Sequence, residues 1–172
     1  MKTLGPQRLG AGLMLLLILW LPGSGIGAGL IEGQTVPAFE LSGLDGKTHS
    51  LDELTANGPT LIVFWSTHCH FCHAMIPDFK RIHAVYHDRG ISFAAVNVGY
   101  EDKAEVRRYV KEHGLEYLVL NDDAKKVELA ETYALIGTPT IVLVSDEHKV
   151  LYYGHTLPDL EPHVPAKAAV AR

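Results

Sequence analysis

The sequence predicts an α/β protein, a three-layer α/β/α sandwich with a mixed central sheet and a short N-terminal hairpin. Two observations predict this fold. Apolar runs of β-forming residues alternate with stretches of helical periodicity, which is typical of a sheet covered by helices. The last two predicted strands, at 140–144 and 150–154, are joined by a short turn, so they form a hairpin and make the sheet mixed.

The first predicted elements are a hairpin, one helical turn and a buried strand. Val36 to His49, with Gly43 and Asp45-Gly46 at its turn, is typical of a short hairpin. Leu51 to Leu54 follows as one helical turn. The continuous apolar run from Thr60 to Trp65 favours a strand that is buried on both faces.

A long helix is predicted next. Five apolar residues recur there at helical spacing: Phe71, Met75, Phe79, Ile82 and Tyr86. We therefore expect a helix from about Cys69 to His87. Pro77 should kink it, because proline has no N–H and clashes with the preceding turn.

The remaining elements follow from the same patterns. They are a strand at 91–98, a helix at 102–113 that Gly114 ends, a strand at 117–120, a helix at 124–133 and the final strands at 140–144 and 150–154. Pro158, Pro162 and Pro165 interrupt the stretch that follows, so we expect no long C-terminal helix.

The first 28 residues have the pattern of a secretory signal. Lys2 and Arg8 give a positive start, an uncharged leucine-rich run follows, and small residues lead to a cleavage site near Ala28. We therefore expect a periplasmic or otherwise extracytoplasmic protein with one domain at residues 29–172. The alternative is an uncleaved membrane anchor, because no charge lies between Arg8 and Glu32.

The charge of the chain argues against two classes of partner. The formal net charge is −5, and it becomes −7 once the first 28 residues, with Lys2 and Arg8 but no acid, are removed. A general nucleic-acid-binding protein would carry a basic face, and so would a protein that binds anionic lipid. We therefore expect neither nucleic acid nor, without an uncleaved anchor, a membrane as a partner.

The only two cysteines, Cys69 and Cys72, are separated by two residues. A disulfide across so short a loop stabilises a fold poorly, so a reversible redox pair or a metal clamp is the better interpretation. Cys69 falls where a buried strand ends and a helix begins, and the unpaired N–H groups and dipole there stabilise a thiolate. Cys69 is therefore the predicted nucleophile. Cys72, one turn later, is the predicted resolving thiol.

Three histidines, His68, His70 and His73, bracket the cysteine pair. A protonated imidazole beside Cys69 would stabilise its thiolate, and His70 is the first candidate because it lies inside the motif. The alternative is a periplasmic carrier of copper or zinc that uses the same thiols and imidazoles. Structural zinc usually needs a second ligand pair, which the sequence does not show, so we expect no resident metal.

A thiol peroxidase is a further alternative. Ser66 lies three residues before Cys69, where peroxiredoxins place a Thr or Ser. Ile62 stands where those enzymes have a proline, so only half of their motif is present.

Several motifs together resemble one family. The segment from Phe64 to Cys72, Phe-Trp-Ser-Thr-His-Cys-His-Phe-Cys, resembles the Phe-Trp-Ala-Thr-Trp-Cys-x-x-Cys of the TlpA/ResA/CcmG branch of the thioredoxin superfamily. Further segments resemble that family's hairpin, central insertion and cis-proline loop: Pro37 to Leu41 with Leu44 to Lys47, Ala95 to Gly99, and Gly137 to Thr140. The resemblance covers residues 30–154.

The resemblance implies a thioredoxin-like fold and a bacterial periplasmic thiol–disulfide oxidoreductase. Its redox group would be the Cys69–Cys72 disulfide without a further cofactor. Its partners would be protein thiols and disulfides and a membrane-bound or periplasmic redox protein. Pro139 would be the cis-proline facing the cysteines, and Thr138 would offer its backbone to an extended substrate segment. Trp65 belongs either to the core or to the flank of the site.

Three residues near the cysteines depart from the family pattern. His68 replaces the usual Trp, Met75 replaces the family's active-site Glu, and Val63 stands where thioredoxins have a buried acid. Neither familiar carboxylate is present to move protons. We therefore expect His70 to make the couple more oxidising than a thioredoxin, while the physiological direction stays open.

Overall fold

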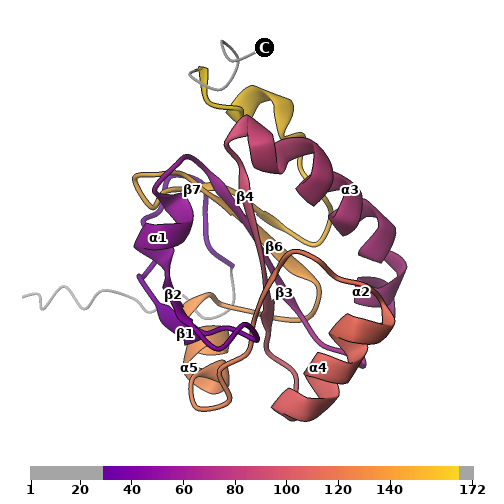
Figure 1. Ribbon diagram of the computed structural model, residues 1–172. Helices are drawn as coiled ribbons and strands as arrows, with labels where there is room; N and C mark the ends of the chain where they lie inside the picture. Colours follow the sequence, from indigo (N-terminus) through magenta and orange to yellow (C-terminus); the bar gives the residue numbers. More distant parts are fainter. Residues whose placement is uncertain (1–28, 167–172) are drawn as a thin grey trace, which may run out of the picture.

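The computed structural model describes residues 29–166, which are built around one five-stranded sheet. Figure 1 shows how the helices surround it. The strand order is β5-β4-β3-β6-β7. The strands are β3 (Thr60–Trp65), β4 (Ser92–Asn97), β5 (Leu118–Leu120), β6 (Thr140–Val144) and β7 (Val150–Gly154). β3, β4 and β5 run parallel, whereas β6 is antiparallel to both β3 and β7. The predicted mixed sheet with a terminal hairpin is confirmed.

Helices and a second, two-stranded sheet cover the central sheet. The antiparallel hairpin consists of β1 (Glu40–Ser42) and β2 (Thr48–Ser50). The helices are α1 (Leu51–Thr55), α2 (His70–Ala74), α3 (Ile76–Tyr86), α4 (Lys103–Glu112) and α5 (Lys126–Thr132), with short 3-10 helices η1 (His87–Arg89) and η2 (Glu161–His163). The hairpin, α1 and α5 lie on one side of the sheet, and α2, α3 and α4 on the other (Figure 1).

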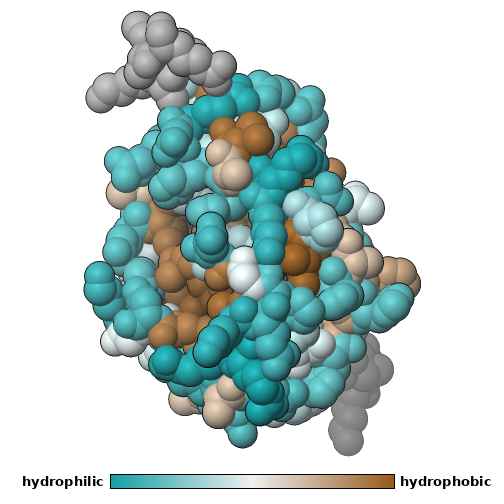
Figure 2. All heavy atoms as spheres, turned by 45° about the vertical axis from the view of Figure 1, so that its right-hand side comes forward, coloured by the Kyte–Doolittle hydropathy of each residue, from teal (hydrophilic) through white to brown (hydrophobic). Residues whose placement is uncertain are grey.

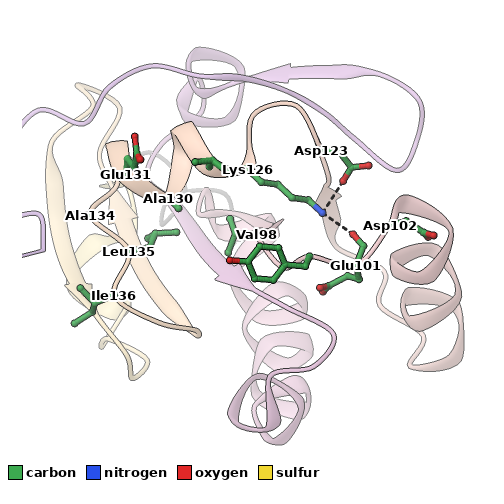
Figure 3. Close-up of a pocket in the computed structure, with 13 residues that line it drawn as sticks. Val98, Glu101, Asp102, Asp123, Lys126, Ala130, Glu131, Ala134, Leu135 and Ile136 are labelled. Carbon is green, nitrogen blue, oxygen red and sulfur yellow. Dashed lines mark hydrogen bonds and ion pairs between the residues drawn. The ribbon is translucent and has the colours of Figure 1, made fainter.

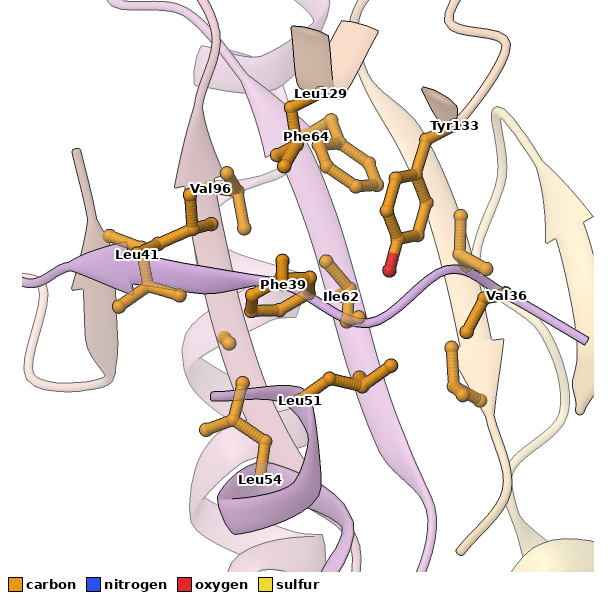
Figure 4. Packing of buried hydrophobic residues seen from close by; sticks show 14 of the residues in the cluster. Val36, Phe39, Leu41, Leu51, Leu54, Ile62, Phe64, Val96, Leu129 and Tyr133 are labelled. Carbon is orange, nitrogen blue, oxygen red and sulfur yellow. The ribbon is translucent and has the colours of Figure 1, made fainter. Parts of the chain in front are cut away.

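Two hydrophobic cores follow from the alternation of β3. Ile62 and Phe64 point to the side of the hairpin and α5, where they pack with Phe39 and Tyr133 (Figure 4). The intervening residues of β3 point to the side of α3 and α4. Every residue of β3 is buried, which confirms the prediction of a strand covered on both faces. The result is the predicted three-layer sandwich.

The predicted helix from Cys69 to His87 is not continuous. It divides at Met75 into α2 and α3, and Pro77 lies in the first turn of α3. The first N–H groups of a helix have no intrahelical partner, so proline is tolerated at this position. Pro77 thus begins a second helix instead of kinking one long helix.

The other boundaries shift by one or two residues. The predicted helix at 124–133 is α5, and residues 155–165 contain the short 3-10 helix η2 and no long helix. Residues 167–172 lie outside the described residues, so the expectation of no long C-terminal helix stays a prediction there. Among residues 29–166, no helix is both long and apolar enough to cross a membrane. The predicted signal or anchor at residues 1–28 lies outside the described residues, so that prediction and the domain boundary it sets stay predictions.

Candidate active site

Cys69 and Cys72 are joined by a disulfide at the start of α2, with 5.2 Å between their Cα atoms. Cys69 is the N-cap of α2, and its Sγ accepts a hydrogen bond from the Cys72 N–H at 3.0 Å. Cys72 is buried with 2% exposure, whereas Cys69 is half-buried. The sulfur that solvent or a substrate can approach is therefore that of Cys69.

The loop that contains Pro139 lies directly against this disulfide. The Thr138–Pro139 peptide bond is cis, as the family resemblance implies. The carbonyl oxygen of Thr138 lies 3.3 Å from the Cys69 Sγ. The loop is held by two side chains: the Thr140 hydroxyl donates to the Gly137 carbonyl at 2.6 Å, and the His155 ring lies 2.7 Å from the Pro139 carbonyl. His155, which has no motif around it, was missed by sequence reasoning.

Trp65 is a core residue that lies behind the cysteine pair. Its side chain is buried, and with Cys72, Val63 and Tyr109 it lines a small closed apolar space. The ring centroids of Trp65 and Tyr109 are 5.4 Å apart. Of the two sequence-based interpretations of Trp65, the core position is therefore the one observed.

The three histidines near the cysteines face different neighbours. The exposed His68 ring lies 3.2 Å from the Glu105 carboxylate. The exposed His70 ring packs edge-on against Phe71. His73 lies 3.0 Å from the Tyr109 hydroxyl, with the His113 ring 4.9 Å away. Within residues 29–166, no three His, Cys, Asp or Glu side chains are placed to hold one metal ion.

A buried carboxylate that sequence reasoning missed lies beneath the loop before Cys69. Glu101 is only 4% exposed, and it accepts hydrogen bonds from the Thr67 backbone N–H, from the Asn97 amide at 2.7 Å and from the Ser66 hydroxyl at 3.3 Å. Asn97 in turn accepts a bond from Asn121 at 3.0 Å. Burial opposes the ionisation of Glu101, but these hydrogen bonds outweigh it and lower the pKa of the carboxyl below its usual value.

A signal for this network was present in the sequence. Trp65 and Asn97 are partners on the parallel strands β3 and β4, so the residues after both strands emerge at the same edge of the sheet. Polar residues at that edge are placed to meet one another. Asn97 ends β4 there and Glu101 follows in the next segment, beside the cysteine loop that follows β3.

A groove of about 820 Å³ opens beside the same edge (Figure 3). Its walls come from residues 98–102, from α5 and from residues 134–136, which precede the cis-proline loop. Lys126 crosses it, donating to the Glu101 carbonyl at 2.9 Å and pairing with Asp123 at 2.8 Å. On the face shown in Figure 2, apolar side chains are visible in hollows that polar residues surround.

Comparison with known proteins places the chain in a family. The model of the Redoxin family matches residues 31–166. The chain is 30% identical over 118 residues to the thiol-disulfide oxidoreductase ResA of Geobacillus thermodenitrificans, covering 69% of this chain and 66% of that protein. It is 33% identical over 112 residues to a thioredoxin-like protein of Haemophilus influenzae, covering 65% and 64%. The chain thus spans slightly less than two thirds of the length of these relatives.

A solved structure shows the same fold. The thioredoxin domain of a thiol-disulfide oxidoreductase from Bacteroides vulgatus superposes with a TM-score of 0.72 at 22% identity, covering 79% of this chain and 99% of that domain. The curated relatives confirm the resemblance seen in the sequence motifs. With the Redoxin match extending over nearly all described residues, including both cysteines and Pro139, the chain belongs to the redoxin family and has a thioredoxin-like fold.

Proposed function

We propose that the chain is an exported thiol–disulfide oxidoreductase that exchanges the Cys69–Cys72 disulfide with protein thiols and disulfides. The observation that carries this proposal is the difference in access between the two sulfurs. The half-buried Cys69 lies against the cis-proline loop, and Cys72 is buried behind it. The disulfide itself is the redox group, and the exchange needs no further cofactor.

The exchange proceeds through a mixed disulfide. In the reductive direction, the Cys69 thiolate attacks one sulfur of a substrate disulfide, and the other substrate sulfur leaves as a thiolate. Cys72 then loses its proton and attacks Cys69, which releases the second substrate thiolate and closes the protein disulfide. Two electrons pass to the substrate. The oxidative direction is the same sequence in reverse, beginning with a substrate thiolate that attacks Cys69.

Two features of the site support Cys69 as the attacking sulfur. Its Sγ accepts a hydrogen bond from the Cys72 N–H, and this bond favours the thiolate over the thiol. The second feature is the cis-proline loop. The Thr138 carbonyl lies 3.3 Å from the same sulfur, which supports a role for this loop in docking the substrate. A substrate segment extended along Thr138 would place its own sulfur beside Cys69.

The location and the redox partner are part of the proposal. The secretory pattern of residues 1–28 supports export, and an oxidising compartment suits a reversible disulfide. A membrane-bound or periplasmic redox protein would then return the Cys69–Cys72 pair to its starting redox state after each exchange. The net charge of the chain speaks against nucleic acid as a partner.

The proposal is tested by the reduction of insulin by the purified protein with dithiothreitol as electron source. We expect reduction faster than with dithiothreitol alone, and we expect the Cys69→Ser protein to lose this acceleration. No acceleration combined with a tight, stoichiometric Cu(I) or zinc complex would instead support the metal carrier. No acceleration combined with rapid consumption of hydrogen peroxide would support the peroxidase.

A further inference from the structure

Within the part of the chain that the structure describes, the Glu101 carboxylate is a buried charge without a cationic partner. The hydrogen bonds that its two oxygens accept come from neutral groups: the Thr67 N–H, the Asn97 amide, the Ser66 hydroxyl and the backbone N–H of Glu101 itself. Among residues 29–166, no Lys, Arg or His forms an ion pair with it. Lys126 contacts Glu101 only at its backbone, because its ammonium group donates to the Glu101 carbonyl and pairs with the carboxylate of Asp123.

This charge is attached directly to the loop that presents Cys69. Thr67, which donates its N–H to Glu101, is two residues from Cys69. Ser66, whose hydroxyl also donates to Glu101, accepts the Cys69 N–H on its carbonyl at 3.2 Å. The same hydroxyl accepts the His68 N–H at 3.2 Å. The carboxylate therefore fixes the conformation of the turn from Ser66 to Cys69 through hydrogen bonds on its buried side.

Gly99 provides the space that this arrangement needs. A Cβ at position 99 would collide with the carboxyl group of Glu101. The glycine thus allows the carboxylate to fold back under the turn, and the close approach explains why a residue without a side chain stands between β4 and α4.

We propose that Glu101 is a positioning residue which fixes the Cys69 turn and whose negative charge lowers the reduction potential of the Cys69–Cys72 couple. The inference rests on the proposed redox function and adds a direction to it. A fixed anion near Cys69 destabilises the Cys69 thiolate, which exists only in the reduced protein. It therefore favours the disulfide and makes the dithiol the stronger reductant.

Glu101, in the segment between β4 and α4, supplies a negative charge that is absent at positions 63 and 75. Other charges around the turn are more exposed to solvent. His68 and Glu105 pair with each other at its outer side, and Asp102 is exposed at the start of α4. Water screens exposed charges strongly, whereas a buried carboxylate acts through a lower dielectric. Glu101 is thus the charge in this cluster with the largest expected effect on the couple.

The decisive variant is Glu101→Gln, which removes the charge and preserves the hydrogen bonds. One oxygen of Glu101 accepts from both Thr67 and Asn97, and the amide oxygen of Gln can take its place. The other oxygen accepts from the Ser66 hydroxyl, which can rotate to accept from the Gln amide. Any change in the reduction potential of the couple is then caused by the loss of the charge and not by a lost hydrogen bond.

The measurement is the equilibrium of the couple with reduced and oxidised glutathione. Two glutathione thiols open the protein disulfide through a mixed disulfide on Cys69 and leave as glutathione disulfide, so electrons and protons balance. We expect Glu101→Gln to shift this equilibrium roughly three- to tenfold toward the dithiol, where tenfold corresponds to about 30 mV. The Cys69 pKa, read from thiolate absorbance, should fall by a matching roughly 0.5–1 unit.

Asp102→Asn is the matched control. It removes the same charge at the adjacent residue, and Asn retains the capping bond that Asp102 accepts from the Glu105 N–H. We expect no measurable shift in potential or pKa. An unchanged couple in Glu101→Gln, or an equal shift in Asp102→Asn, would overturn the proposal.

A second measurement keeps the proposal testable if Glu101→Gln does not fold. In the wild-type protein with ¹³C-labelled glutamate, the Glu101 carboxyl resonance should shift as Cys69 ionises, because the coupling between two charges is reciprocal. A resonance unaffected by the Cys69 titration would overturn the proposal. Neither measurement uses a physiological substrate, so a protein that shows the Glu101 effects but does not reduce insulin overturns the proposed function alone.

Discussion

The backbone N–H of Thr67 donates a hydrogen bond to the carboxylate of Glu101, which joins the cysteine loop after β3 to the segment after β4. The two residues are 34 positions apart in the sequence. They meet because β3 and β4 are parallel neighbours whose ends coincide at one edge of the sheet. This bond connects the stability of the fold to the geometry of the redox site.

Glu101 should make the stability of the protein depend on pH. Its pKa is lowered in the folded state, so the folded protein binds the Glu101 proton less readily than the unfolded chain does. The carboxylate therefore stabilises the fold above the ordinary Glu value of about 4.3, and this contribution is lost as the pH falls through the lower, folded value. Urea unfolding of wild type and Glu101→Gln between neutral pH and pH 3 checks this. Identical pH profiles would contradict it.

Gly99→Ala should displace the Glu101 carboxylate. The new methyl group would occupy the position of the carboxyl group, so the hydrogen bonds to Ser66 and Thr67 should be lost. We expect a loss of about 1–3 kcal/mol in the free energy of unfolding, the usual cost of leaving buried polar groups without partners. Gly137→Ala is a suitable control, because a Cβ there meets nothing within 4 Å. Equal stability of the two variants would refute this account of Gly99.

His70→Ala should raise the Cys69 pKa and lower the potential, as the sequence suggests, because it removes a group that can be positive beside the thiolate. The side chain is exposed, so solvent screens its charge. We therefore expect a shift opposite in sign to that of Glu101→Gln and smaller in size. Measured in the same glutathione buffers, a larger shift than that of Glu101→Gln would show that His70 dominates the couple.

Tyr133 links α5 to the segment before the hairpin. Its ring is fully buried beside Phe64, with 5.0 Å between ring centroids, and its hydroxyl donates to the Pro37 carbonyl at 2.9 Å. Tyr133→Phe keeps the ring and removes that bond, so we expect a loss of about 1 kcal/mol in unfolding free energy. Tyr100→Phe, at a fully exposed tyrosine, should leave stability unchanged. The prediction fails if urea denaturation gives the two variants the same midpoint.

The sequence alone could predict most of the fold, because its strands have strong local signals. The run from Leu61 to Trp65 is apolar without interruption, and the structure buries all of it. The division of the long helix at Met75 was missed, because helical periodicity continues through it. Only the position of Pro77 relative to the break distinguishes a helix start from a kink.

The parts of the candidate site that form contiguous sequence motifs could be predicted, whereas the residues that reach it from distant segments could not. The cysteine pair and the cis-proline loop are contiguous motifs, so their residues were identified directly. Glu101 and His155 reach the site through strand pairing and a distant loop, and no local pattern marks them. Val63 and Met75 leave both of the family's carboxylate positions without an acid, and the carboxylate of Glu101 lies beneath the cysteine loop from a third position.

The most direct test of the central claim is the capture of a mixed disulfide by single-cysteine variants. The Cys69 thiolate of Cys72→Ser should attack a disulfide-bonded peptide, release one peptide thiolate and keep the other peptide half as a stable mixed disulfide, because the half-buried sulfur is accessible and no resolving thiol remains. In Cys69→Ser, the buried Cys72 should give little adduct. Mass spectrometry of both proteins after incubation with a peptide disulfide shows which cysteine carries the peptide adduct. Adduct formation on Cys69 alone is the result we predict, and preferential adduct formation on Cys72 would contradict the account.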